Sequence, residues 1–200
     1  MNDTQQIAPP SVLAAIITDT DALGFPMASD AQTGSLLRTL AATKPGGTFL
    51  ELGTGTGLAT AWILDGMDRA ARLTTLDNEP SVLAVARRHL GNDQRVTFLQ
   101  TDGGVFLETQ QAQIYDFIFA DTWPGKYDHL DAAFRLLKPG GLYIIDDMLP
   151  QPSWPDGHAA RVPELLSALD KREDIVATKL AWATGLVVAT KRSQLVRASG

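Results

Sequence analysis

Acidic residues lie at or next to the ends of five short apolar runs in this sequence. They are Glu51, Asp77, Asp102, Asp121 and the pair Asp146–Asp147. Carboxylates are rare in the interior of a parallel sheet, because a buried charge is tolerated only when it is paired. Carboxylates gathered at one sheet edge therefore predict a cationic or hydroxyl-rich ligand, or a metal ion that prefers oxygen ligands.

A glycine-rich turn follows the first of these acids. The segment Phe49–Gly57 is an apolar run that contains Glu51 and continues into Gly53, Gly55 and Gly57, at every second position. Glycine permits a positive φ and a close approach of a ligand to the main chain. The helix predicted to follow offers unpaired N–H groups at its start. The segment therefore predicts a strand, a tight turn and a helix N-terminus, with a ligand at the tip of the strand.

The spacing of the glycines indicates the kind of ligand. It differs from the Gly-x-Gly-x-x-Gly pattern of dinucleotide-binding turns, which disfavours a nicotinamide-dependent oxidoreductase. Glu51, two residues before the first glycine, would repel a phosphate and favour an ammonium group. Asp77 lies 20 residues after Gly57, close to the spacing at which a second-strand acid binds ribose hydroxyls. An adenosine with a cationic amino-acid tail fits both acids.

Composition limits the class of protein. A chain of 200 residues, with 44% hydrophobic and 20% charged residues, is typical of one globular domain, so residues 1–200 are interpreted as a single domain. The net charge of -6 and the pI of about 4.9 weigh against binding to nucleic-acid phosphates. The absence of cysteine excludes disulfides, thiolate metal sites and cysteine nucleophiles. No signal-peptide pattern and no apolar run of roughly 20 residues is present, so we expect a cytoplasmic protein that does not bind membranes.

Predicted strands and helices alternate from Thr48 onward, which is typical of a parallel sheet covered on both faces. The expected strands are Thr48–Leu52, Arg72–Leu76, Val96–Gln100, Tyr115–Ala120 and Leu142–Asp146, followed by an antiparallel hairpin of Ile175–Trp182 and Leu186–Lys191. The expected helices are Leu58–Met67, Pro80–Leu90, Gly103–Gln110, Tyr127–Leu137 and His158–Lys171. The predicted fold is a doubly wound α/β, Rossmann-like sheet of seven strands, mostly parallel.

Two further helices are expected before the sheet. One spans Ser11–Asp21 with Ser11 as its N-cap, and the other runs from its cap Asp30 to about Thr43. Residues 1–47 thus form a predicted N-terminal helical cap, and residues 48–191 form the ligand-binding core. The sequence leaves open whether the two helices pack on the sheet or form a lid over the ligand.

The run from Glu51 to Gly57 resembles motif I of the class I S-adenosylmethionine-dependent methyltransferases, and the resemblance extends over residues 48–191. It implies S-adenosylmethionine as the methyl donor, held at the glycine turn, with Asp77 on the ribose and Asp102 and Gly103 at the adenine. Positions implied to contact the cofactor are Met27, Ser29, Glu51, Gly53, Thr54, Gly55, Gly57, Asp77, Asp102, Gly103, Asp121 and Trp123. Of these, Trp123 would pack on the adenine, and Met27 and Ser29 would cover the methionine end.

The segments Phe117–Tyr127 and Gly140–Asp147 are similar to a narrower group, the cation-dependent O-methyltransferases of the catechol and caffeoyl-coenzyme A type. This resemblance implies a divalent cation, magnesium or else calcium or manganese, bound by Asp121, Asp146 and Asp147. Such an ion would chelate a diol and lower the pKa of the acceptor hydroxyl.

The chain departs from that group at two positions. Asp147 stands where the group has asparagine, and Pro124 stands where the catechol enzymes have a catalytic lysine. Lys126, two residues further on, is the candidate general base, and Asp121 is the second candidate catalytic residue. Trp154, His158 and Arg161 follow the acidic pair and are candidates to face the substrate.

The predicted function is methyl transfer from S-adenosylmethionine to an oxygen of a small-molecule acceptor such as a diol, assisted by a divalent cation. Two alternatives stay open: a metal-independent methyltransferase acting on a nitrogen or a carboxylate, and a non-catalytic S-adenosylmethionine-binding module. A homodimer is an option among the expected partners, and nucleic acid is not expected.

Overall fold

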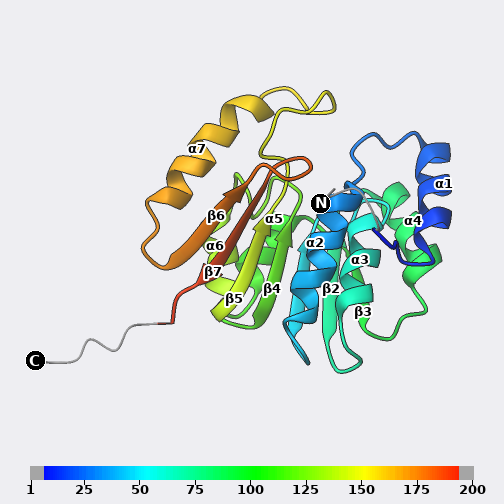
Figure 1. Ribbon diagram of the computed structural model, residues 1–200, viewed down its shortest axis with the longest axis horizontal. Coiled ribbons are helices and arrows are strands. Elements are labelled where there is room, and N and C mark those ends of the chain that lie inside the picture. The colour runs from blue at the N-terminus through cyan, green and yellow to red at the C-terminus, as the bar shows by residue number, and fades with distance from the viewer. Residues whose placement is uncertain (1–6, 194–200) are drawn as a thin grey trace, which may run out of the picture.

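A seven-stranded sheet forms the centre of the computed structural model, which describes residues 7–193 (Figure 1). The strands are β1 (Thr48–Leu52), β2 (Arg72–Asp77), β3 (Val96–Gln100), β4 (Tyr115–Ala120), β5 (Leu137–Ile145), β6 (Ile175–Leu180) and β7 (Leu186–Lys191). Their order is β3-β2-β1-β4-β5-β7-β6. Strands β1 to β5 pair in parallel, whereas β7 is antiparallel to both β5 and β6. The predicted Rossmann-like sheet with its antiparallel hairpin is confirmed.

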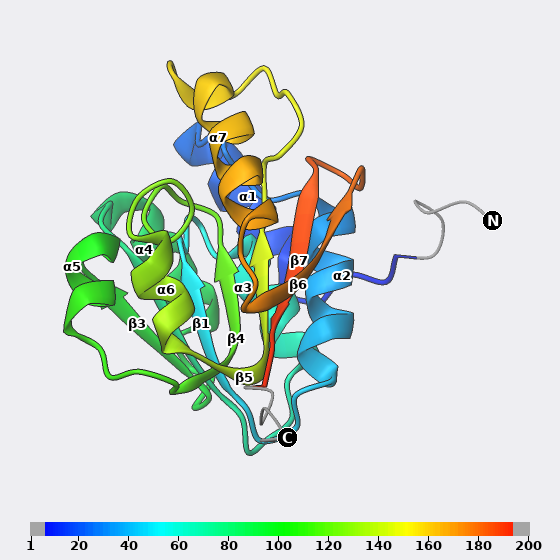
Figure 2. The same ribbon diagram turned by 90° about the vertical axis from the view of Figure 1, so that its left-hand side faces the viewer.

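Helices cover both faces of the sheet (Figure 2). They are α1 (Leu13–Leu23), α2 (Ala31–Ala42), α3 (Leu58–Gly66), α4 (Pro80–Leu90), α5 (Gly103–Thr109), α6 (Leu130–Leu136) and α7 (His158–Asp170). Neighbouring strand residues point to opposite faces, so Phe49 and Phe117 join one core with α1, α2 and α3, while Leu50 and Ile118 join the other with α5, α6 and α7. Two apolar cores therefore fix the strands that carry the acids.

The N-terminal helices pack on neighbouring helices, and one of them reaches the glycine turn. Helix α2 packs on α3, where Gly34 lies so close to Trp62 that an added Cβ would fall 2.2 Å from the indole. Helix α1 reaches the glycine turn, because the Thr20 hydroxyl donates to Thr56 Oγ1 at 2.8 Å. The segment 25–30 between them lines the cavity described below.

Several element ends differ from the predicted ones for identifiable reasons. Asp30 caps α2 as predicted, accepting from Gln32 N at 2.6 Å, but α1 begins after Val12 without a side-chain cap, so the role predicted for Ser11 is wrong. Helix α6 begins only at Leu130, because His129 adopts a left-handed backbone with φ 58°. Strand β5 begins at Leu137 and includes the predicted turn Lys138–Gly141, with a register shift against β4.

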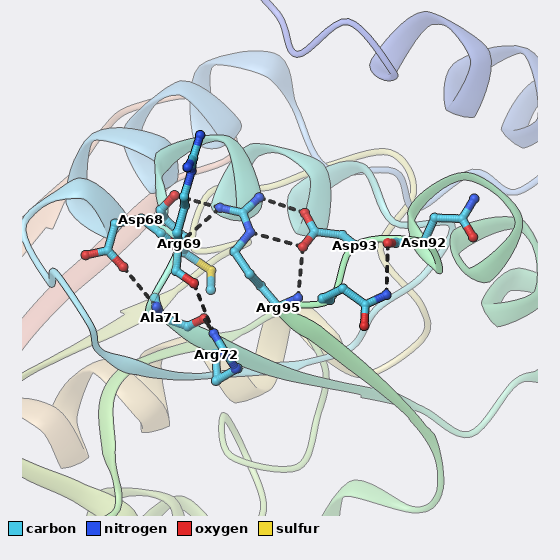
Figure 3. A network of polar contacts seen from close by, with 9 residues as sticks. Asp68, Arg69, Ala71, Arg72, Asn92, Asp93 and Arg95 are labelled. Atoms are coloured by element: carbon cyan, nitrogen blue, oxygen red, sulfur yellow. Dashed lines mark hydrogen bonds and ion pairs between the residues drawn. The ribbon is translucent and has the colours of Figure 1, made fainter.

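The opposite edge of the sheet, where the parallel strands begin, carries a closed polar network (Figure 3). The Arg95 guanidinium donates to both carboxylate oxygens of Asp93, at 3.0 and 2.7 Å, and to the Met67 carbonyl at 2.7 Å. Asp68 accepts from the backbone N–H groups of Gly46 and Ala71, each at 2.8 Å. These bonds tie the loops that lead into β2 and β3.

None of the helices in residues 7–193 combines the length and the apolar character needed to cross a membrane.

Candidate active site

A cavity of about 590 Å³ lies beyond the C-terminal ends of the parallel strands. Its lining includes the segment 25–30, the glycine turn, residues 77–79, the segment after β4, the acidic pair with the loop that leads into α7, and Thr184. Figure 2 shows that loop above the arrowheads of the parallel strands. The carboxyl ends of strands in a doubly wound sheet are where ligands bind. The cavity therefore lies at the end of the sheet where the sequence predicts the site.

The glycine turn is held open toward the cavity. The N–H groups of Gly53 and Thr54 donate to the Leu76 carbonyl at 3.0 and 3.1 Å, and Gly55 N–H donates to Asp77 Oδ2 at 2.8 Å. Gly53 has φ 94°, and a Cβ there would fall 2.9 Å from the Asp121 carbonyl oxygen. These four residues, Gly53, Thr54, Gly55 and Asp77, line the cavity, and their contact with a cofactor stays a prediction.

The third glycine of the turn has a different role. Gly57 adopts φ 95° just before α3, and a Cβ there would fall 2.9 Å from Ala86 Cβ on α4. It does not belong to the cavity lining. Gly57 thus permits the close packing of α3 on α4, and its contact with the cofactor stays a prediction.

Glu51 lies beneath the turn and not in the cavity lining. Its side chain is fully buried, and Oε2 accepts hydrogen bonds from the Thr60 and Thr75 hydroxyls, each at 2.5 Å. Oε1 has no hydrogen-bond partner. Burial raises the pKa of Glu51 to about 7, against the opposing effect of the two threonines. The predicted direct contact with an ammonium tail does not follow from this placement.

Asp102 and Gly103 also lie outside the cavity lining. Asp102 caps α5, where its Oδ1 accepts from Val105 N–H at 2.9 Å. Gly103 packs on the ring of Pro124, 3.0 Å from the position of an added Cβ. Trp123, Met27 and Ser29, in contrast, line the cavity. The structure therefore brings together most of the predicted cofactor residues, but not Glu51, Gly57, Asp102 or Gly103.

Three carboxylates and one ammonium group occupy the cavity end near β4 and β5. Asp121, Lys126, Asp146 and Asp147 all line the cavity. Lys126 is 2% exposed, and its Nζ lies 3.7 Å from Asp147 Oδ2. Lys126 is thus a buried, ion-paired residue of the site.

The carboxylates Asp146 and Asp121 accept hydrogen bonds from other residues of the protein. Asp146 Oδ1 accepts from Asp147 N–H at 2.8 Å and from the Thr184 hydroxyl, and Asp121 Oδ2 accepts from the Ser29 hydroxyl at 3.1 Å. Asp147 has a left-handed backbone with φ 63°, which aspartate tolerates better than most residues. Burial raises the pKa of Asp121 well above its usual value, and the Asp146 carboxylate adds to the rise. Burial likewise raises the pKa of Asp146 to about 6.

The candidate substrate-facing residues divide into two groups. Trp154 and His158 line the cavity and stack on each other, with ring centroids 4.3 Å apart. His158 Nε2 hydrogen-bonds with the Tyr127 hydroxyl at 2.8 Å. Arg161 does not line the cavity, because its guanidinium donates to the Tyr127 carbonyl at 2.9 Å and to Asp128 Oδ1 at 2.8 Å. Arg161 therefore braces the loop and does not face a substrate.

Phe25, Glu79 and Thr184 line the cavity and were not among the predicted site residues. Glu79 stands two residues after Asp77, so its place near the strand end follows from the sequence once the strand is known. Thr184 lies in the turn between β6 and β7, which reaches the site only because β7 pairs with β5. A sequence pattern gives no signal for that pairing.

The side chains near the acidic pair bear on the predicted divalent cation. Within residues 7–193, no three histidine, aspartate or glutamate side chains form a group suited to a metal ion. The three carboxylates named by the resemblance share their end of the cavity with the Lys126 ammonium group. The donor set as folded does not fit a divalent cation.

Comparison with known proteins shows what the core is similar to. A sequence profile of the methyltransferase domain matches residues 50–148. A candidate O-methyltransferase of Mycolicibacterium paratuberculosis is 31% identical over 117 residues, which cover 56% of this chain and 53% of that protein. The chain thus spans about half the length of this curated relative.

Solved structures are similar over nearly the whole chain. A candidate O-methyltransferase from Klebsiella pneumoniae has 26% sequence identity and a TM-score of 0.81, covering 94% of this chain and 93% of its own. TomG, an O-methyltransferase from Streptomyces achromogenes solved with S-adenosylmethionine, has a TM-score of 0.81 at 22% identity and covers 96% of this chain and 94% of its own. The second likeness concerns the fold alone.

Proposed function

Because a profile of the methyltransferase domain matches residues 50–148, we propose that the protein transfers a methyl group from S-adenosylmethionine to an oxygen of a small-molecule acceptor. The observation that carries the proposal is a single cavity that joins the glycine turn and Asp77 to Asp121 and Lys126. One end is suited to a nucleoside and the other to a reacting hydroxyl. The relatives named as O-methyltransferases support oxygen as the methyl acceptor.

The cofactor would lie on the glycine turn. Gly53, Thr54 and Gly55 offer an open backbone there, and Asp77 stands beside it. The Asp77 carboxylate accepts one internal bond at each oxygen, from Gly55 N–H and Glu79 N–H, which leaves acceptor capacity for a ribose diol. S-adenosylmethionine supplies an electrophilic methyl group on a positively charged sulfur. Met27 and Ser29 in the segment between α1 and α2 would cover that end.

The acceptor would enter between the pair Trp154–His158 and the charged end of the cavity. A lone pair of its hydroxyl oxygen forms the new C–O bond while the C–S bond breaks and its electron pair stays on sulfur. We assign the hydroxyl proton to the Asp121 carboxylate, because burial makes this carboxylate more basic than an exposed aspartate. Holding the oxygen in line with the methyl group supplies much of the rate.

Lys126 was predicted as the general base, and its surroundings favour another role. Its Nζ lies 3.7 Å from Asp147 Oδ2, so the side chain forms an ion pair at the charged end of the cavity. We therefore assign Lys126 to stabilise negative charge that develops on the acceptor oxygen. No step of the reaction is assigned to a divalent cation, since the donor set does not fit one.

Binding and turnover test the proposal. Calorimetry should show that the protein binds S-adenosylmethionine, and Asp77→Asn should weaken binding at least tenfold by removing a charged acceptor of two ribose hydroxyls. A panel of phenols, catechols, amines and carboxylates with radiolabelled methyl donor should give label on the phenols or catechols. Asp65→Asn, a half-exposed residue that pairs with Arg38 at 3.3 Å, is the matched control and should bind normally.

Three results would oppose the proposal in different ways. No binding of S-adenosylmethionine would remove it altogether. Tight binding without methyl transfer to any acceptor would select the non-catalytic module. Label found only on amines or carboxylates would select the alternative acceptor class. A cytoplasmic location and a homodimer stay predictions, the second open to analytical ultracentrifugation.

A further inference from the structure

The charged end of the cavity contains its own cation. Lys126 is 2% exposed, with Nζ 3.7 Å from Asp147 Oδ2, and it lines the cavity together with Asp121 and Asp146. One ammonium group and three carboxylates therefore share this end of the cavity. A buried ammonium group is retained in a fold only where carboxylates compensate it.

The backbone fixes this lysine in place. Gly125 adopts φ 86°, and a Cβ there would fall 2.4 Å from Leu52 Cδ1, so the residue before Lys126 must be glycine. The Gly125 carbonyl accepts from the buried Tyr143 hydroxyl at 2.5 Å, and Lys126 N–H donates to the Trp123 carbonyl at 3.1 Å. The turn is anchored to strands β1 and β5, so the ammonium group is a constant part of the site.

Each of the three carboxylates has a partner within the chain. Asp146 Oδ1 is already held by Asp147 N–H and the Thr184 hydroxyl, and Asp121 Oδ2 by the Ser29 hydroxyl. Asp147, whose carboxylate pairs with Lys126, is the residue that stands where the similar cation-dependent group has asparagine. The additional negative charge therefore has a partner within the chain.

We infer that Lys126 takes the place of the divalent cation, so that this protein needs no metal ion and binds its acceptor against an ammonium group. A single positive charge does not chelate two oxygens in the manner of a metal ion. The acceptor class that follows is a phenol or other acidic hydroxyl compound, which needs one neighbouring cation, and an adjacent second hydroxyl is not required. This inference on the acceptor rests on the proposed methyl transfer, whereas the exclusion of the metal ion does not.

Manganese binding tests the inference without reference to turnover. Electron paramagnetic resonance of Mn²⁺ titrated into the metal-free protein should show little binding to the native chain. Lys126→Met removes the ammonium group at similar side-chain length, and Mn²⁺ affinity should rise at least tenfold as the carboxylates lose their cation. Asp147→Asn breaks the same ion pair from the other side and should not raise the affinity. If the substitutions only disturbed the fold, the Mn²⁺ affinity of both variants would change in the same direction.

Activity gives the second readout. The native protein treated with a chelator should methylate mono-phenols and catechols at an unchanged rate, and Lys126→Met should lower kcat/KM by about 100-fold or more. Lys138→Met, which removes a half-exposed lysine paired with Asp116 at 2.7 Å, is the matched control and should keep native kinetics and Mn²⁺ affinity.

Two outcomes overturn the inference: Mn²⁺ binding by the native chain as tight as by Lys126→Met, or a chelated protein that regains activity only with a divalent ion. Should Lys126→Met fail to fold, the measurements on the native chain and on Asp147→Asn still decide. Calorimetric binding of S-adenosylmethionine and label transfer by the same samples separate the two proposals, because loss of either would oppose the methyl-transfer proposal, whereas the Mn²⁺ titration alone decides on the metal ion.

Discussion

Strand β4 carries an aspartate at each of its ends, and the two lie in opposite environments. Asp116 lies at the start, where its Oδ2 accepts from Lys138 Nζ at 2.7 Å and from Thr48 N–H at 2.8 Å. Burial alone would raise the pKa of Asp116, but these donors outweigh it and hold the pKa below its usual value. Asp121 follows the other end, where burial and the Asp146 carboxylate raise its pKa well above the usual value.

The same contrast holds for the two edges of the whole sheet. At the edge drawn in Figure 3, hydrogen bonds from Arg95 lower the pKa of Asp93, and those from Ala71 and its neighbours lower the pKa of Asp68. At the cavity edge, carboxylates are crowded and share one ammonium group. Fully paired carboxylates stabilise a fold, whereas groups with raised pKa values at a cavity are typical of sites that do chemistry. The edge with paired carboxylates thus contributes to stability, and the cavity edge contributes to function.

The largest expected effect comes from Asp121→Asn. An amide cannot take the acceptor proton, so kcat/KM should fall by about 100-fold to 10,000-fold. The free energy of unfolding at neutral pH should not decrease, because a carboxyl group with a raised pKa destabilises the fold once it ionises. Radiolabel transfer and urea denaturation at pH 7.5 measure the two quantities.

Asp116→Asn is the matched control on the same strand. It should reduce the free energy of unfolding, because Lys138 Nζ and Thr48 N–H lose a charged acceptor, while methyl transfer stays at the native rate. Equal losses of activity in the two variants would contradict the division between the edges.

Glu51→Gln should change how stability depends on pH. The folded-state pKa of Glu51 is raised to about 7 from 4.5, so its stabilising contribution is complete below pH 4.5 and is lost as the pH rises through 7. The native chain should therefore lose roughly 3 kcal/mol more than Glu51→Gln between pH 4.5 and pH 7.5. Urea denaturation across this range provides the measurement.

Asp93→Asn serves as the comparison from the opposite edge. The pKa of Asp93 is lowered by Arg95, so its contribution to stability is lost only in acid. Above pH 4.5, the free energy of unfolding of Asp93→Asn should therefore depend on pH as that of the native chain does. Parallel curves for the native chain and Glu51→Gln would show that Glu51 has the same pKa in the folded and the unfolded chain, contrary to its burial.

The sequence predicted the fold well because the relevant signals are local. The strands and helices are marked in the sequence by apolar runs, by residues typical of helix ends and by the turn at Gly53 and Gly55. The predicted start of the helix at Tyr127 was wrong because the left-handed conformation of His129 depends on tertiary packing against Gly104.

The site was predicted only in part, for a related reason. Position along a strand indicates which residues reach its carboxyl end, but not which way each side chain points. Glu51 and Asp102 both sit where contact was expected, and one is turned into the sheet while the other caps a helix. The burial of Lys126 follows from the packing of Gly125 on Leu52, a contact between residues 73 positions apart that no local pattern records.

The smallest expected effect comes from Arg95→Met at the edge that the comparison assigns to stability. Arg95 donates to both oxygens of Asp93 and to the carbonyls of Met67 and Asp68, and its side chain is 23% exposed. Loss of this partly solvated set should reduce the free energy of unfolding by roughly 1–2 kcal/mol, since solvent screens part of each bond. Methyl transfer should be unchanged, because the network lies at the edge of the sheet opposite the cavity.

Arg69→Met, at an exposed arginine of the same loop, is the matched substitution and should cost less. Urea denaturation of both variants beside kinetic assays gives the answer. A fall in kcat for Arg95→Met without a matching loss of stability would mean that the two edges are coupled through β2 and β3, and the separation of stability from function would not hold.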